Sequence, residues 1–218
     1  MSKLAVQRCN KLTSLKLILL LVFFSLNGIA RVLPIEKTPA LPSAIMQQLP
    51  TDYELMMFAS GYLNDDKLLD YLVVVHKKGE QATFDKTREG SPRPLFIFIQ
   101  NANATFTPAK RNDSVVMSID EGGQCDPFGI DDREGDLVIK NHYFTVQNSV
   151  ACGEHWEDLT TFKYDRKLKN WMFHKNSFES WSLNDSDDPN AEALISNGVS
   201  IINANPKKPI LFEQYKSN

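Results

Sequence analysis

The sequence predicts an all-β protein, mainly an antiparallel sandwich, barrel or bent sheet, with one short N-terminal helix. Short runs of β-branched and aromatic residues recur along the chain, and polar segments rich in Gly, Asn and Asp separate them. Residues 43–49 are the best helix candidate. No repeat at the period of a propeller or solenoid is present.

Residues 1–30 are organised as a secretory signal peptide. Four basic residues precede the apolar run at 17–26, and Gly28 and Ala30 follow at the −3 and −1 positions of a cleavage site. The run is shorter than the roughly 20 apolar residues that a membrane-spanning helix needs. We expect cleavage before Arg31, and retention as an uncleaved anchor is the alternative.

Residues 31–50 are a proline-rich lead-in that ends in the predicted helix. Ser43 is placed to cap a helix that runs to Leu49, and Pro50 ends it. Residues 51–218 then form a single β-rich domain.

Strand candidates follow in order along this domain. They cover 53–59, 71–76, 95–99, 104–109, 114–119, 137–139, 143–146, 159–164 and 171–174, with 210–212 as a candidate edge strand. The run 95–99 is apolar at every position, which indicates burial on both faces. Turn residues at 141–142 and 165–170 predict two hairpins.

Three polar stretches, at 77–94, 120–136 and 183–206, are expected to be irregular. The second carries the acidic residues Asp131, Asp132, Glu134 and Asp136. A solvated loop is the expected role of such a charge run, and a weak cation site or a partner-facing acidic patch is the alternative.

The charge balance excludes two classes of partner. After removal of residues 1–30, the chain has 20 basic and 27 acidic residues and a net charge of −7. Binding of nucleic acid or of anionic lipid needs a basic surface that attracts phosphate groups. We therefore expect no nucleic-acid partner, and no membrane insertion once the signal peptide is cleaved.

Cys125 and Cys152 are the cysteines that remain after cleavage. Two cysteines in an oxidising compartment usually pair, so we expect a disulfide between them. On the chain-entropy model, a loop of about 26 residues makes it worth roughly 3 kcal/mol. Two separate buried thiols are the alternative. A zinc site is disfavoured because no C-x-x-C pair accompanies them.

The segment GYLNDDKLLD at 61–70 precedes an apolar strand and resembles the calcium loop of FG-GAP (VCBS-type) repeats, whose pattern is close to G-D-L-N-G-D-G-x-x-D. The matching positions are Gly61, Leu63, Asn64, Asp66 and Asp70. The resemblance implies one calcium ion held by Asn64, Asp66 and Asp70, because side-chain oxygens at alternating positions can converge on a hard cation.

The loop also departs from the family pattern. Tyr62 replaces the first acidic ligand, and Asp65 and Lys67 replace the two glycines. The alternative is a turn in which Asn64 and Asp66 accept hydrogen bonds from backbone N–H groups. A single copy of the loop argues against a propeller.

More loosely, residues 55–175 are similar to uncharacterised exported bacterial proteins that carry a degenerate FG-GAP loop. The similarity covers the order of the loop, the strands and the Gly/Cys segment. It implies a β-rich fold and an envelope location, and it implies no assigned activity.

The segment 152–158, CGEHWED, contains the candidate catalytic residues Glu154, His155 and Glu157. His155 and Glu157 alternate along an extended chain, so they are expected on one face. Carboxylates beside a histidine suit acid–base chemistry, and Asp158 is a further candidate acid. No G-x-S-x-G signature accompanies them. The alternative is a solvated strand start with Trp156 packed inward.

Three tryptophans and three histidines are the remaining candidate binding residues. Trp156, Trp171 and Trp181 are either a sugar-binding face or core residues. The histidines His76, His142 and His174 lie in separate predicted strands or turns, and the sequence does not assign them to one metal.

Together these observations predict a periplasmic or secreted, non-enzymatic binding or interaction domain, with an unknown protein or glycan partner in the envelope. The first alternative is an envelope hydrolase acting on glycan through the carboxylates near His155. The second is a calcium-stabilised structural module. Calcium is the one cofactor considered, and otherwise none is expected.

Overall fold

The computed structural model describes residues 40–129 and 136–217, which belong to one unit, Ala40–Asn218. The predicted signal peptide and residues 31–39 of the lead-in lie outside the described residues, as do Asp131, Asp132 and Glu134. No helix within the described ranges is long and apolar enough to cross a membrane.

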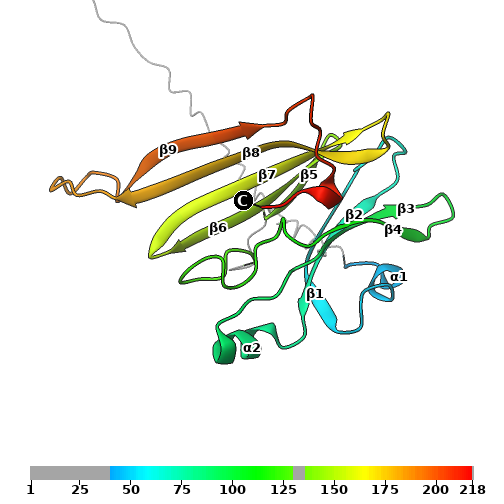
Figure 1. The fold of residues 1–218 in the computed structure, drawn as a ribbon, viewed down its shortest axis with the longest axis horizontal. Helices are drawn as coiled ribbons and strands as arrows, with labels where there is room; N and C mark the ends of the chain where they lie inside the picture. The colour runs from blue at the N-terminus through cyan, green and yellow to red at the C-terminus, as the bar shows by residue number, and fades with distance from the viewer. Residues whose placement is uncertain (1–39, 130–135, 218) are drawn as a thin grey trace, which may run out of the picture. The chain divides into compact units, whose positions relative to one another are not determined.

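Two antiparallel sheets make up the fold, and within each sheet every strand pairs with the next strand along the chain (Figure 1). The four-stranded sheet contains β1 (Tyr53–Gly61), β2 (Asp70–Lys77), β3 (Leu95–Gln100) and β4 (Phe106–Asn112). The five-stranded sheet contains β5 (Leu137–Lys140), β6 (Tyr143–Cys152), β7 (Glu154–Asp165), β8 (Asn170–Leu183) and β9 (Leu194–Asn203). The all-β prediction is confirmed, and neither sheet closes into a barrel.

The main core lies between the two sheets. Side chains alternate along each strand, so Leu72 and Ile97 of the four-stranded sheet face Phe144 and Phe162 of the five-stranded sheet. All four are buried, and the rings of Phe144 and Phe162 stack with centroids 5.0 Å apart. Burial of each such side chain contributes roughly 1.5–3 kcal/mol.

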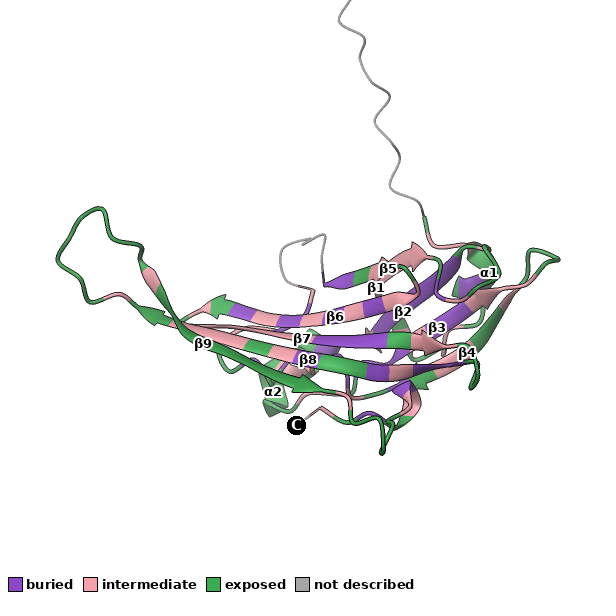
Figure 2. Ribbon diagram, turned by 90° about the horizontal axis from the view of Figure 1, so that it is seen from above, coloured by how far each residue is buried: buried purple, intermediate pink, exposed green. Residues whose placement is uncertain are grey.

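The four-stranded sheet is buried on its other face as well. Val73, Val75 and Phe98 form a second cluster there with Ile45, which belongs to α1 (Ser43–Met46). Purple bands therefore cross β2 and β3 without strict alternation (Figure 2). The expectation that strand 95–99 is covered on both sides is confirmed.

One helix lies in a stretch that we expected to be irregular. Helix α2 (Glu80–Thr87) begins after Gly79, which has a φ of 72°, and ends at Arg88, which has a φ of 60°. The helix has little apolar periodicity, so the sequence pattern did not predict it. A buried ion pair from Glu80 to Arg93 holds it to the domain.

Three further expectations about strands were wrong. Residues 114–119 form bends and turns, because the side-chain oxygen of Asn112 accepts bonds from the backbone N–H groups of Ser114 and Val115. The stretch 183–206, which we expected to be irregular, contains β9, and β9 pairs with the preceding strand β8. In the candidate edge strand 210–212, only Leu211 forms a bridge, and Phe212 begins the 3-10 helix η2 (Phe212–Gln214).

Candidate functional site

The outer face of the five-stranded sheet is the face that points away from the core. Because Phe144 and Phe162 point inward, their neighbours Tyr143, Thr145 and Thr161 must point outward. The four-stranded sheet packs against the inner face of the five-stranded sheet and does not contact its outer face. Among the described residues, three of the four sheet faces contribute to a buried cluster, and no such cluster lies on this face.

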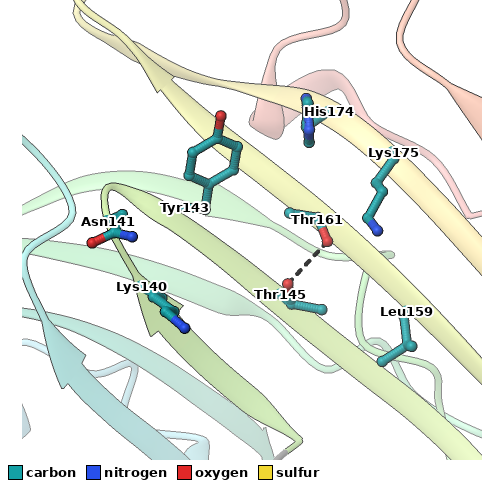
Figure 3. A pocket seen from close by; sticks show the side chains of 8 residues that line it. All are labelled: Lys140, Asn141, Tyr143, Thr145, Leu159, Thr161, His174 and Lys175. Carbon is teal, nitrogen blue, oxygen red and sulfur yellow. Dashed lines mark hydrogen bonds between the residues drawn. The ribbon is translucent and has the colours of Figure 1, made fainter.

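A hollow of about 420 Å³ lies on this outer face (Figure 3). We call it the Tyr143 hollow, and its lining residues are Lys140, Asn141, Tyr143, Thr145, Leu159, Thr161, His174 and Lys175. They come from β5, β6, β7 and β8 and the turn between β5 and β6. The hollow therefore depends on strand register, and no contiguous motif encodes it.

The ring of Tyr143 is held at the end of the hollow by two neighbours. The His174 ring meets it edge-on, with centroids 5.2 Å apart. The ammonium group of Lys163 lies 5.3 Å from the Tyr143 centroid, in a cation–π arrangement. Beside it, the hydroxyl groups of Thr145 and Thr161 are hydrogen-bonded at 2.9 Å.

The hollow is locally basic although the domain is acidic. Register places Lys140 opposite Tyr143, and Tyr143 opposite Lys163, while Lys175 lies opposite Thr161 in the adjoining row. Burial, and then the positive charges of Lys163 and Lys175, lower the pKa of His174. An anionic group would therefore find several cations and a neutral imidazole here.

A second hollow of about 350 Å³ lies at the other end of the five-stranded sheet. We call it the His155 hollow, and Glu157, Trp181 and Glu192 also line it. His155 and Glu157 share the outer face, as the alternation predicts, because they pair with Trp181 and Glu179 of β8.

The other two candidate acids are placed differently. Glu154 is exposed at the start of β7, where it pairs with Cys152. Asp158 points to the inner face, where it accepts hydrogen bonds from Asn176 Nδ2 at 2.6 Å and from the hydroxyl of Thr160 at 3.1 Å. Burial raises the pKa of Asp158. Asp158 thus has a structural role, on the opposite face from His155.

The candidate calcium ligands use their oxygens within the chain. Asn64 Oδ1 accepts the N–H of Asp66 at 2.8 Å, and Asp66 Oδ1 accepts the N–H of Leu68 at 2.9 Å. Asp70 accepts the N–H groups of Leu63 and Gln100, each at 3.1 Å. This is the bonding expected of the turn alternative.

The electrostatics of Asp70 follow from its position at the start of β2. Its side chain is fully buried, and burial raises its pKa to about 6 against the opposing effect of the backbone donors. Within the described ranges no group of three or more His, Cys, Asp or Glu residues is arranged to hold a metal. Calcium at this loop stays a prediction.

The expected cysteine pair is brought together. Cys125 and Cys152 lie at disulfide distance, with Cα atoms 6.3 Å apart. The pair joins the segment before β5 to the end of β6. Within the same irregular segment, Asp136 Oδ2 accepts the N–H of Gly129 at 2.9 Å, so this acid stabilises the loop.

The tryptophans divide between core and surface. Trp171 is buried, and its indole N–H donates to the carbonyl of Leu63 at 3.0 Å. The ring of Trp156 packs near Phe178, with centroids 6.1 Å apart. Of the three, only Trp181 points to the outer face. A continuous tryptophan platform is therefore not formed.

The candidate histidines are also dispersed. His76 lies 3.4 Å from Glu80, and His142 lies 3.4 Å from Asp65, while His174 lines the Tyr143 hollow. Sequence reasoning missed Tyr143 and the lysines around it. In the sequence, these residues could have been recognised only because they alternate with aromatic residues that point into the core.

Comparison of the chain with protein-family models, curated proteins and solved structures finds no match. The class of protein is therefore defined by its fold and its site. It is a two-sheet antiparallel β domain with one open sheet face, and that face carries a basic, aromatic hollow.

Proposed function

We propose that this protein is an exported, non-enzymatic binding domain and that its ligand lies on the outer face of the five-stranded sheet, in the Tyr143 hollow. One observation supports this most directly. Three sheet faces are used for the core, and the fourth presents the Tyr143 ring of β6 near lysines from β5, β7 and β8. The signal-peptide pattern and the cysteine pair support export to the periplasm or beyond.

The ligand chemistry that fits is a glycan with carboxylate or phosphate substituents. The Tyr143 ring lines the hollow and offers aromatic surface to a sugar, beside the Lys163 ammonium group that lies over the ring. The bonded hydroxyl groups of Thr145 and Thr161 retain one donor and further lone pairs for sugar hydroxyl groups. Lys140 and Lys175 are placed to attract the acidic substituents.

The test is titration of the naturally processed protein with acidic oligosaccharides and with neutral oligosaccharides of equal length. We expect saturable binding of the acidic series that weakens as salt is raised. Tyr143→Ala should weaken it by up to about tenfold, since one aromatic contact is worth roughly 0.5–1.5 kcal/mol. Lys207→Gln, on an exposed lysine outside the hollow, is the matched control. Equal binding by wild type and Tyr143→Ala, or no binding of either series, would overturn the proposal.

A second candidate function is glycan hydrolysis at the His155 hollow. The observation that favours it is that two carboxylates, Glu157 and Glu192, line one hollow together with His155. Glycosidases use such pairs at separations of about 5 to 9.5 Å. Release of reducing ends from envelope glycan, lost in Glu157→Gln and kept in Glu179→Gln, is the outcome that selects this function over binding alone.

A further inference from the structure

Strand β9 forms an open edge of the five-stranded sheet. Ten residues, Leu194–Asn203, pair with β8 on one side. No described strand pairs with the other side, and Figure 1 shows it at the margin of the sheet. An unpaired edge of this length is a template for a further strand.

The other three edge strands, β1, β4 and β5, have neighbours along part of their length. Strands β1 and β5 approach so closely that a Cβ atom at Gly61 would lie 2.6 Å from Cγ2 of Ile139. Next to β4 lies the C-terminal segment, where Glu213 contacts Lys110 at 2.7 Å and the amide of Asn112 donates to the Phe212 carbonyl at 2.6 Å. The long open edge is therefore specific to β9.

The composition of β9 does not protect it from pairing. Residues 193–206 contain no charged residue, and the first proline is Pro206. Exposed edge strands are usually protected by lysine, proline or short length, and β4 has such residues in Pro108, Lys110 and Arg111. In β9, large apolar side chains are exposed instead: Ile195 (50%), Val199 (54%), Ile201 (57%) and Ile202 (48%).

We propose that β9 pairs with β9 of a second copy of this chain, antiparallel about a two-fold axis, to make one continuous sheet. The distribution of charge favours a second copy of the chain as the partner of β9. The processed chain carries a net charge of −7, so two copies repel each other in general, and this uncharged stretch is a place where they can meet without facing like charges. Closed two-fold pairing is the commonest form of self-association.

The bulge in β9 makes the edge self-complementary. Glu179 lies opposite Val199 but Trp181 lies opposite Ser196, so β9 has one extra residue, at Gly198, whose φ is 101°. Side-chain hydrogen bonds between β8 and β9 show which face of the sheet each residue of β9 points to. Ser196 bonds Glu179 at 2.6 Å on the outer face, and Asn197 bonds Ser182 at 3.0 Å on the inner face.

The extra residue brings Ile195 and Ile202 to the same face of the sheet. Ile202 lies opposite Asn176 and Ile195 opposite Ser182, which are six positions apart on β8 and therefore point the same way. In an antiparallel pair centred between Gly198 and Val199, Ile195 of each copy faces Ile202 of the other. Two isoleucine pairs would then be covered on the inner face. The outer faces of both copies would also point to the same side.

The test is the mass in solution of the naturally processed protein, measured without ligand by light scattering over a concentration series. We expect a dimer. Ile202→Lys should raise the dissociation constant by at least about tenfold, because a charge would be buried opposite Ile195. Ile210→Lys changes an isoleucine that is 41% exposed and lies outside β9, and it should leave the dimer unchanged. Thermal melts that match wild type establish that both variants fold.

Register is tested separately by cross-linking. The double variant Ile195→Cys with Ile202→Cys should form a covalent dimer on oxidation, whereas Ile195→Cys alone should not. A monomer at every concentration, a dimer that survives Ile202→Lys, or equal cross-linking by the single variant would each overturn the proposal. Because no ligand is present, these outcomes are independent of the proposed binding function.

Discussion

The guanidinium of Arg93 lies 2.7 Å from the carboxylate of Glu80, measured from Nη2 to Oε2, and both side chains are buried. Asp126 contacts the same guanidinium at 2.5 Å on its other side. Glu80 begins α2, and Asp126 follows Cys125 in the irregular segment before β5. Arg93 therefore holds two long loop segments, the one that contains α2 and the one before β5, against the four-stranded sheet.

Removal of the arginine should be strongly destabilising. Arg93→Met would leave Glu80 and Asp126 without their cation, and loss of one partner from a buried ion pair costs about 3–5 kcal/mol. Urea unfolding measures the change in free energy. The control is Arg111→Met, whose pair with Asp113 is exposed on both sides and should contribute less than about 1 kcal/mol. Equal effects of the two substitutions would contradict this reading.

The buried carboxyl of Asp70 should make stability depend on pH. Its pKa in the folded protein is about 6, above the ordinary 3.8, so the folded state binds the proton more tightly than the unfolded state. The contribution of Asp70 to stability is therefore present below about pH 4 and is lost as pH rises through 6. Between pH 4 and pH 7, the free energy of unfolding of Asp70→Asn should rise by up to about 3 kcal/mol relative to that of the wild type. Unfolding of both proteins across this range measures it, and a constant difference would contradict the prediction.

Added calcium should leave the melting temperature unchanged. The oxygens that would bind the ion accept backbone N–H groups of the chain instead, at Asn64, Asp66 and Asp70. Thermal melts in excess calcium and in chelator compare the two cases. A rise of several degrees with calcium, absent in Asp66→Asn, would support the calcium-stabilised module.

Loss of the cysteine pair should weaken the fold without changing its secondary structure. The sequence separation of Cys125 and Cys152 is 27 residues, and closure of such a loop is worth roughly 3 kcal/mol on the chain-entropy model. Cys125→Ser with Cys152→Ser should lower the free energy of unfolding by about that amount. Far-ultraviolet circular dichroism provides the control. An unchanged denaturant midpoint would show that the pair adds no stability.

Much of the strand arrangement could be predicted locally. The hairpins at 141–142 and 165–170 follow from turn residues between apolar runs, and the structure places β5–β6 and β7–β8 there. Helix α2 was missed because the ion pair of Glu80 with Arg93, and no apolar periodicity, holds it in place. Strand β9 was missed because it is an exposed edge strand that pairs with β8 and has no buried alternating face. The stretch 114–119 has strand-like composition, yet its backbone bonds to Asn112 instead.

The candidate site was less predictable than the fold. Alternation was enough to place His155 and Glu157 on one face, because side chains on a strand repeat every second residue. The Tyr143 hollow combines residues from four strands, and only their register brings Lys163 over the Tyr143 ring and Lys140 and Lys175 into the lining of the hollow. Register depends on turns and bulges, such as the shift after Thr161, which the sequence does not display.

The sequence by itself determined the all-β class, the two hairpins and the strand buried on both faces, because each of these depends on local alternation and turn chemistry. Only the tertiary structure decided which sheet face stays open and which edge stays unpaired. Exposure of a face or an edge depends on what packs across from it, and those contacts join residues far apart in the chain. The Tyr143 hollow and the β9 edge are both of this kind.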